Sequence, residues 1–202
     1  MISFKNKKVI VFDLDGTIVK LSVDWGNLNR LLNNRYNDVY GENYEFVHIS
    51  ACLDHVVDKD DETELQNFFE MLEEYEMKSI KSNENIDETL FFINNLSKFE
   101  VPKSIKLAIL SLNTRKTILE SLKVAGINKK IDFIIGREDV RKWKPNPEGL
   151  LKIRDHFNVK EKDMMYIGDL EKDVVTGNNA GIVTFLIDDL INLVNKKRKK
   201  IT

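Results

Sequence analysis

The 202-residue sequence has one cysteine, three histidines and three prolines, and its apolar runs are only as long as a strand. Because Cys52 is alone, an internal disulfide is excluded, and the simplest expectation is a protein of the reducing cytoplasm. The N-terminus lacks the long apolar segment and the small-residue cleavage site of a secretory signal peptide. No stretch approaches the roughly 20 apolar residues that span a bilayer, so no membrane partner is expected.

Several common binding motifs are missing as well. The absence of CxxC and HExxH patterns excludes the usual zinc sites. Walker A and GxGxxG patterns are also absent, which excludes the two commonest nucleotide-binding loops. A net charge of −2 does not favour a nucleic-acid partner. The basic run "KKRKK" at 196–200 is therefore interpreted as a solvated, frayed C-terminus.

Apolar, β-branched runs that resemble buried strands recur along the chain, at 8–12, 105–110, 131–135, 164–167 and 182–187. Helical patterns at 114–126, 146–157 and 173–181 separate the later runs. Alternating strands and helices predict an α/β fold, a three-layer, Rossmann-like core around a parallel sheet covered on both faces.

Local signals mark the ends of these helices. Asn146 and Pro147 suit the N-cap and the first helical position, and Gly126 suits a C-terminal cap. In the helix at 114–126, we expect one buried side formed by Ile118, Leu119, Leu122 and Val124.

Residues 19–82 interrupt the alternation. They show helical patterns at 24–40, 46–58 and 62–80 and no convincing strand, and a further helix at 86–99 leads back to the sheet. Residues 19–82 hold 14 acidic and 6 basic residues (net −8), whereas the rest holds 19 and 25 (net +6). The sequence therefore predicts an α/β core of residues 1–18 and 83–202 with an all-helical insertion at 19–82.

The most hydrophobic strand ends in two carboxylates, in "VIVFDLDGTI" at 9–18. Period two along a strand points Asp13 and Asp15 to the same side and Leu14 to the other. They stand at the carboxyl end of the strand, where α/β sheets bind ligands. Gly16 permits a sharp turn, and Thr17 returns a hydroxyl toward the pair. A turn with a capping aspartate is the alternative for these residues taken alone.

Other strand ends carry polar groups too. Ser111 ends the second core strand, Lys144 precedes a predicted helix, and Asp169 and Asp173 follow the fourth core strand. Taken singly, each has a simpler interpretation as a turn hydroxyl, a solvated lysine or a helix cap. Together they place carboxylates, a hydroxyl and an ammonium at one edge of one sheet, which favours a functional site.

This ordered set resembles the haloacid dehalogenase superfamily, with "DLDGT" at 13–17, Ser111, Lys144 and "GDLEKD" at 168–173 as its four motifs. The resemblance covers essentially the whole chain, with residues 19–82 where the family inserts a helical cap. The nearest subgroup is the phosphoglycolate-phosphatase-like hydrolases. The resemblance implies Asp13 as the nucleophile that forms an aspartyl-phosphate and Asp15 as the acid and base, roles that suit carboxylates.

The resemblance also implies Mg²⁺ as the cofactor, held by Asp13, Asp169 and the backbone carbonyl of Asp15, with Asp173 holding a metal-bound water; hard oxygen ligands suit this ion. Thr17, Ser111 and Lys144 would bind the phosphoryl oxygens, where positioning and charge supply most of the rate.

The sequence departs from the family in three places. Leu112 follows Ser111 where relatives often have a small polar residue, and Asn113 is expected to take its place. Leu170 replaces a small or hydroxyl residue, which affects packing. Lys20 and Leu21 stand where phosphoglycolate-type relatives often have Asp-Ser.

These observations predict a Mg²⁺-dependent phosphatase for a small phosphorylated metabolite, acting as a monomer or homodimer. A sugar phosphomutase and a non-catalytic binding protein on the same fold are the alternatives. The insertion would select the substrate, with leaving-group charge met by residues such as Lys20, Arg30 or Arg35. Arg30 and Arg35 are about 140° apart on one helix at ~100° per residue, so at most one is expected to face the site.

Overall fold

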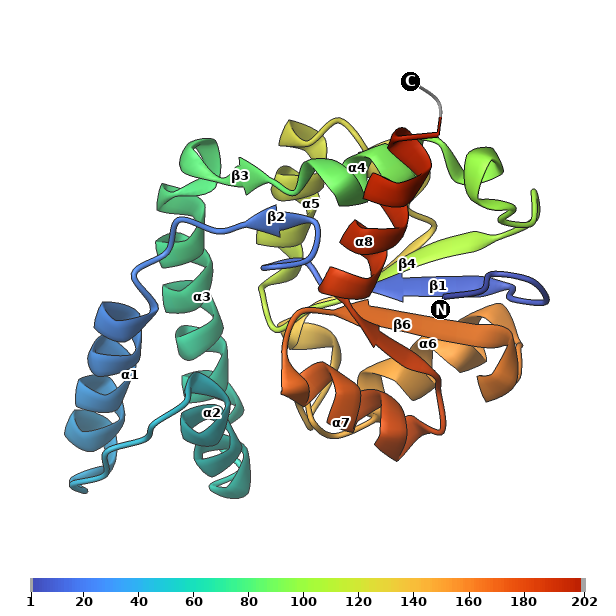
Figure 1. Cartoon of the computed structure of the whole chain (residues 1–202). Coiled ribbons are helices and arrows are strands. Elements are labelled where there is room, and N and C mark those ends of the chain that lie inside the picture. The colour runs from blue at the N-terminus through green and yellow to red at the C-terminus, as the bar shows by residue number, and fades with distance from the viewer. Residues whose placement is uncertain (1, 201–202) are drawn as a thin grey trace.

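The computed structural model describes residues 2–200 and contains a five-stranded parallel sheet (Figure 1). The strand order is β5-β4-β1-β6-β7, and all four neighbouring pairs are parallel. The strands are β1 (Val9–Phe12), β4 (Lys106–Leu110), β5 (Phe133–Ile135), β6 (Met164–Gly168) and β7 (Thr184–Leu186). The predicted parallel α/β fold is thereby confirmed.

Helices cover both faces of this sheet. Side chains alternate along β1, so Val9 and Val11 join one apolar cluster while Ile10 and Phe12 join the other. The first cluster packs against α6 (Glu148–Phe157) and α7 (Glu171–Ala180). The second packs against α4 (Asp87–Asn94), α5 (Arg115–Val124) and α8 (Ile187–Arg198), on the opposite side of the sheet in Figure 1.

Short 3-10 turns occupy several connections in the described chain. They are η1 (Ile80–Ser82), η2 (Leu96–Phe99), η3 (Asn128–Lys130), η4 (Arg137–Asp139) and η5 (Glu161–Asp163). The described helices include none that is both long and apolar enough to cross a membrane.

Between β1 and β4 the chain leaves the sheet to form what we call the insert (residues 19–82). Its helices are α1 (Trp25–Tyr40), α2 (Ile49–Asp58) and α3 (Glu62–Lys78), close to the predicted helical ranges. Two short strands, β2 (Val19–Lys20) and β3 (Glu84–Asn85), pair antiparallel where the chain leaves and returns. Asp24 and Asp61 cap α1 and α3 by accepting hydrogen bonds from Asn27 N and Glu64 N, both at 2.9 Å.

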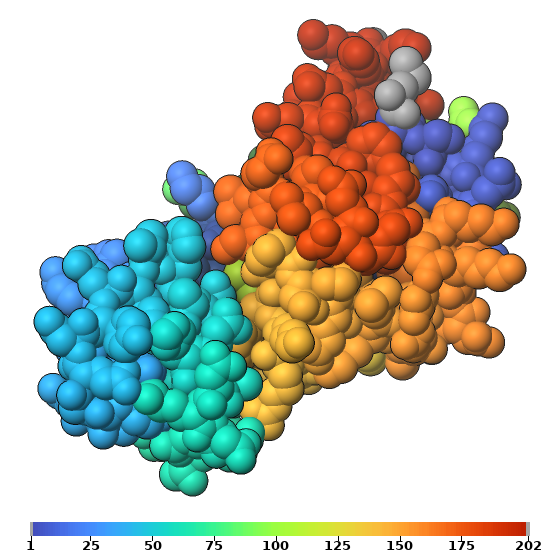
Figure 2. All heavy atoms as spheres, turned by 90° about the horizontal axis from the view of Figure 1, so that it is seen from below, coloured from blue at the N-terminus to red at the C-terminus, as the bar shows by residue number. Residues whose placement is uncertain are grey.

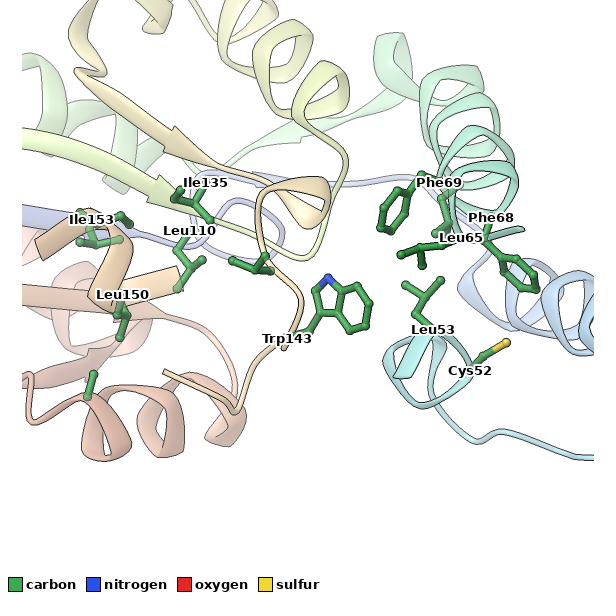
Figure 3. Packing of buried hydrophobic residues seen from close by; sticks show 14 of the residues in the cluster. Cys52, Leu53, Leu65, Phe68, Phe69, Leu110, Ile135, Trp143, Leu150 and Ile153 are labelled. Atoms are coloured by element: carbon green, nitrogen blue, oxygen red, sulfur yellow. The ribbon is translucent and has the colours of Figure 1, made fainter. Parts of the chain in front are cut away.

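The insert packs against the core through apolar side chains. Trp143, in the loop before α6, lies between core residues such as Leu110 and insert residues such as Leu53 and Phe69 (Figure 3). The Phe69 and Trp143 rings meet edge to face with centroids 6.4 Å apart. In the space-filling view the insert forms a lobe against the core segment around residue 140 (Figure 2).

Two expectations for core helices need correction. The prediction of Asn146 as N-cap and Pro147 as first helical residue was wrong by one position: Pro147 is the N-cap and α6 begins at Glu148, although Asn146 Oδ1 accepts a hydrogen bond from Glu148 N at 3.0 Å. In α5, Ile118 and Leu122 are buried as predicted, but Leu119 and Val124 are 45% and 55% exposed, so half of the predicted buried side was wrong. At ~100° per residue Ile118 and Leu122 lie one turn apart on the buried side, whereas Leu119 points about 60° to 100° and Val124 about 120° to 160° away from them.

The C-terminal segment differs from its predicted frayed state. It forms α8 as far as Arg198, and Ile187, Leu190 and Val194 are buried against the sheet at helical spacing. Acidic residues in its first turn and basic residues in its last turn complement the helix dipole. The basic run at its end is thus mainly the continuation of an amphipathic helix.

Candidate active site

Parallel strand order brings the predicted residues to one edge of the sheet. β1 lies between β4 and β6, so the residues that follow these three strands surround one cavity of about 300 Å³. The cavity is lined by seven of the eight predicted site residues, namely Asp13, Asp15, Ser111, Asn113, Lys144, Asp169 and Asp173. Thr17 does not line it; its hydroxyl is buried with no hydrogen-bond partner among the described residues.

A sharp turn after β1 aims the two first-motif carboxylates into the cavity. Leu14 is fully buried on the other side, as the strand period predicts. Gly16 has φ +75°, and a Cβ there would lie 2.1 Å from Asp169 Oδ2, so both conformation and contact require glycine. Asp15 Oδ1 accepts a hydrogen bond from Leu21 N at 2.8 Å, which ties this carboxylate to the start of the insert.

Lys144 is buried between two carboxylates. Its Nζ lies 3.0 Å from Asp13 Oδ2 and 2.7 Å from Asp173 Oδ1. Burial lowers the pKa of Lys144, but the charges of Asp13 and Asp173 outweigh this effect and raise the pKa. The ammonium is therefore kept charged beside Asp13.

Tyr166, on β6, completes the surroundings of this lysine. Its hydroxyl donates to Asp173 Oδ1 at 2.7 Å and accepts from Lys144 Nζ at 3.1 Å. Sequence reasoning missed this residue, because Tyr166 sits inside an apolar strand and reads as core. Its only sequence signal is a phenol in the strand that leads to Asp169.

The cavity carries more negative charge than the described side chains neutralise. Burial is the largest cause that raises the pKa of Asp13 to about 7, with repulsion from Asp173 adding to it and Lys144 opposing it. Burial, then Asp173, raises the pKa of Asp169 to about 6. Burial also raises the pKa of Asp15. A bound cation would relieve this accumulation of charge.

Three carboxylates lie close enough to share such a cation. One oxygen from each of Asp13, Asp169 and Asp173 lies within 4.8 Å of the others. Asp173 already accepts hydrogen bonds from Lys144, Tyr166 and the backbone of Leu170. Asp169 Oδ1, by contrast, is buried with no partner within residues 2–200. Asp169 is therefore the carboxylate most available to a hard cation such as Mg²⁺, whereas Asp13 already accepts from Leu14 N at 2.8 Å and pairs with Lys144.

Ser111 and Asn113 form a hydrogen-bonded loop after β4. Ser111 Oγ donates to Asn113 Oδ1 at 2.9 Å, and Asn113 N donates to Ser111 Oγ at 3.2 Å. Ser111 N is held by Ile135 O on β5 at 3.1 Å. The loop thus holds a buried hydroxyl at the cavity wall, next to the strand that ends in Asp13.

Glu76, on α3 of the insert, reaches this loop and was missed by sequence reasoning. Its buried carboxylate accepts hydrogen bonds from Asn113 Nδ2 at 3.1 Å and from Thr114 N and Oγ1, both at 3.0 Å. Arg137 Nη2 lies 3.6 Å from Glu76 Oε1. Nothing in the acidic sequence around Glu76 distinguishes it from a solvated helix residue.

The basic residues proposed for the insert lie elsewhere. Arg30 donates to Asn27, and Arg35 forms an ion pair with Glu64. At most one of these two arginines was expected to face the site, and neither lines the cavity. Lys20 lines a neighbouring hollow beside the β2–β3 pair. The insert lines the active-site cavity with Trp25, Asn29, Val47, His48, Ile49 and Ser50.

Comparison with known proteins leads to the same family that the sequence motifs resemble. Residues 10–187 match the haloacid dehalogenase-like hydrolase family. The pyrophosphatase PpaX of Halalkalibacterium halodurans is 26% identical over 183 residues, which cover 88% of this chain and 82% of the relative. PpaX of Bacillus cereus strain Q1 is 26% identical over 180 residues, covering 87% and 80%.

Solved structures share the fold. A haloacid dehalogenase-like hydrolase from Bacteroides fragilis has a TM-score of 0.65 at 24% identity, covering 88% of this chain and 86% of the other. A protein described as a predicted phosphoglycolate phosphatase from Haemophilus somnus has a TM-score of 0.62 at 18% identity, covering 90% and 85%. With a family match that spans most of the chain and a parallel sheet that gathers the four motifs around one cavity, the protein belongs to the haloacid dehalogenase-like hydrolases.

Proposed function

We propose that the protein is a Mg²⁺-dependent phosphatase that hydrolyses a small phosphorylated metabolite through an aspartyl-phosphate on Asp13. The observation that carries this proposal is the placement of Lys144 3.0 Å from Asp13, in a cavity that Ser111 and Asp15 also line. A nucleophile, a cation and hydroxyl donors around one small volume are what phosphoryl transfer requires. Relatives named as pyrophosphatases support a phosphorylated substrate.

In the first step, a carboxylate oxygen of Asp13 forms a bond to phosphorus as the bond to the leaving oxygen breaks. Asp15, whose pKa is raised by burial, would give its proton to that leaving oxygen. Lys144 and Ser111 would hold the phosphoryl oxygens and balance their charge. In the second step, Asp15 takes a proton from a water that attacks phosphorus. The bond between phosphorus and Asp13 breaks, orthophosphate departs, and the Asp13 carboxylate is regenerated.

The residues present fit Mg²⁺, which Asp13 and Asp169 would hold. The unpartnered buried Oδ1 of Asp169 and the raised pKa values of both carboxylates are the observations that support this fit. When bound, the ion neutralises carboxylate and phosphoryl charge and orients the phosphoryl group. Asp173 would act through Lys144 and Tyr166, which it holds, in addition to the expected contact with a metal-bound water.

We further propose that the insert (residues 19–82) acts as a cap on a core of residues 1–18 and 83–202. The β2–β3 pair and the hydrogen bonds from Ser22 to Ser82 and Asn83 support a narrow hinge between the two. A cap that closes over the cavity would exclude water and add contacts to the leaving group. The protein is expected in the cytoplasm, as a monomer or homodimer, with no nucleic-acid or membrane partner.

Turnover of p-nitrophenyl phosphate with Mg²⁺ tests the proposal. A phosphatase turns over unaided, a phosphomutase does so poorly without a bisphosphate activator, and a binding protein does not turn over. Asp15→Asn should still permit attack on this activated ester but slow dephosphorylation, so a phospho-enzyme accumulates. Mass spectrometry should locate the added phosphate on the peptide that contains Asp13. A label on Ser111 or on a histidine would contradict the mechanism.

A further inference from the structure

Arg137 is a buried arginine on the cavity wall whose donors are underused. It begins the η4 turn after β5, is only 4% exposed and lines the same cavity as Asp13. Its Nε–H is buried and has no hydrogen-bond partner in the part of the chain that the structure describes. An arginine is seldom buried without full pairing, and an unsatisfied buried donor costs stability.

The one carboxylate that faces Arg137 closely is already engaged. Glu76 lies 3.6 Å from Nη2, but its oxygens accept three shorter hydrogen bonds from Asn113 and Thr114, at 3.0 to 3.1 Å. A guanidinium carries five N–H donors in a planar fork. Glu76 therefore balances the charge of Arg137 and leaves most of its donors available to an anion.

Arg137 is fixed at a distance from the reacting centre. Its backbone N donates to Asn113 O at 2.9 Å, and its carbonyl accepts from Trp143 Nε1 at 3.0 Å. β5 is two strands from β1, so roughly 10 Å of sheet, with the Ser111–Asn113 loop between, separates the two backbones. The charged neighbours of Arg137 are Glu76 and Glu138, whereas those of Asp13 are Lys144 and Asp173.

We propose that Arg137 binds a second anionic group, a carboxylate or a phosphate, on the leaving-group part of the substrate. The proposal rests on the phosphatase function above. Lys144 and Ser111 occupy the side nearest Asp13, so a guanidinium farther along the wall meets atoms beyond the transferred phosphoryl group. The arginines of the insert are bonded to Asn27 and Glu64, which leaves this role to a residue of the core.

A pair of matched substrates tests the proposal. Phosphoglycolate and 2-hydroxyethyl phosphate differ in one group, a carboxylate against an alcohol, and pyrophosphate supplies a second phosphate. In Arg137→Gln, kcat/KM should fall about 10- to 100-fold for phosphoglycolate or pyrophosphate, the loss expected for a charged hydrogen bond. It should change less than about threefold for 2-hydroxyethyl phosphate and p-nitrophenyl phosphate. Whichever of these two substrates, the ester phosphoglycolate or the anhydride pyrophosphate, loses more identifies the anion as carboxylate or phosphate.

Two further variants separate binding from folding. Arg137→Lys keeps the charge and should retain part of the preference, because lysine cannot reproduce the planar fork. Arg141→Gln is the matched control, since Arg141 lies in the same loop, is largely exposed and pairs with Glu62. Its selectivity should equal that of the wild type. An equal loss for all four substrates in Arg137→Gln would overturn the proposal, because the residue would then serve the transferred phosphoryl group or the fold.

Calorimetry on the unmodified protein gives a test that needs neither turnover nor a folded variant. In excess Mg²⁺, phosphonoacetate or methylenediphosphonate should bind at least about 10-fold more tightly than methylphosphonate, which lacks the second anion. Equal affinities would overturn the role of Arg137. Tighter binding without hydrolysis of any ester would instead contradict the phosphatase function and leave the anion site standing.

Discussion

The sheet edge and the insert face each other across one cavity, but they line it with different chemistry. The sheet edge supplies carboxylates, Lys144 and Arg137 from strand ends and their loops. The insert supplies mainly apolar and neutral groups, among them Trp25, Val47 and Ile49. Charge is thus concentrated on the side fixed by the sheet. This favours a division in which the core carries out the phosphoryl chemistry and binds an anionic leaving group through Arg137, while the insert contacts the uncharged parts of the leaving group.

The two regions also differ in how they are held. Asp13, Ser111 and Asp169 follow β1, β4 and β6, whose backbones are bonded on both sides, so their positions are rigid. The insert is joined by the β2–β3 pair, by the contact of Phe69 with Trp143, by Glu76 and by the exposed ion pairs Glu62–Arg141 and Glu73–Lys116. Fewer contacts at a narrow hinge suit a segment that opens and closes.

Removing the nucleophile should have the largest effect. Asp13→Asn is expected to lower kcat by roughly four orders of magnitude or more for every phosphate ester, because an amide cannot supply the attacking oxygen. Asp163→Asn is the control, since Asp163 lies at the opposite end of β6 and pairs with Lys8. Steady-state assays with p-nitrophenyl phosphate measure both. Retained activity in Asp13→Asn would place the chemistry elsewhere.

Removing the metal should also impair only the phosphoryl chemistry that the core carries out. We expect excess EDTA to reduce turnover roughly 100-fold or more, because charge stabilisation by the metal contributes several kcal/mol. Mg²⁺ or Mn²⁺ should restore the rate, and Ca²⁺ should inhibit, since its larger coordination shell lets Asp13 bind through both oxygens. Full activity in chelator contradicts the metal assignment.

Removing the insert tests the division of labour directly. Lys20 pairs with Glu84, so a short Gly/Ser linker in place of residues 22–82 can join the two strands without moving the core. Hydrolysis of p-nitrophenyl phosphate should persist weakly, while preferences among natural metabolites fall by about 10-fold or more. A residual preference for an anionic leaving group is expected from Arg137. Unchanged selectivity among neutral leaving groups would show that the core alone chooses the substrate.

Loosening the insert–core contact should have a smaller effect. Phe69→Ala removes a ring that is packed on Trp143 and is expected to lower the free energy of unfolding by about 3 kcal/mol. Leu119→Ala on the exposed side of α5 is the control and should cost less than about 1 kcal/mol. Chemical denaturation measures both. Equal losses would mean that the aromatic contact contributes little.

The smallest expected effect concerns an ion pair within the insert. Burial raises the pKa of Glu64, but its hydrogen bonds from Arg35 and Asn67 outweigh burial and the net pKa is lowered. Because its folded-state pKa is lowered, ionised Glu64 stabilises the protein at pH values above its unfolded-state pKa of about 4.3. This stabilisation is lost as the pH falls through the folded-state pKa. Glu64→Gln should therefore destabilise by about 0.5–1 kcal/mol at pH 7. The difference from wild type should shrink toward pH 3; a constant difference in denaturation midpoints would exclude the charge as its cause.

Sequence patterns predicted much of the core because their signals are local. Continuous apolar strands followed by polar residues fix which groups end each strand, and the parallel order then brings those groups to one edge. That is why Asp13, Ser111 and Asp169 could be named in advance, whereas Lys144 was named from its place before a predicted helix and from the family resemblance. The errors were local too: α8 was missed because its basic end hid a regular buried spacing, and the predicted buried side of α5 included Leu119 and Val124.

Tertiary structure alone decided which ordinary residues join the site. Glu76 and Asn113 are 37 positions apart, and Lys144 and Tyr166 are 22 apart, so no periodicity within one element could pair them. Docking of α3 on the loop after β4 buries Glu76, and the loop after β5 then buries Arg137 beside it. A charged side chain in a sequence is by default solvated. Only packing between distant segments removes that solvent, and burial is what turns such residues into fixed charges at the cavity.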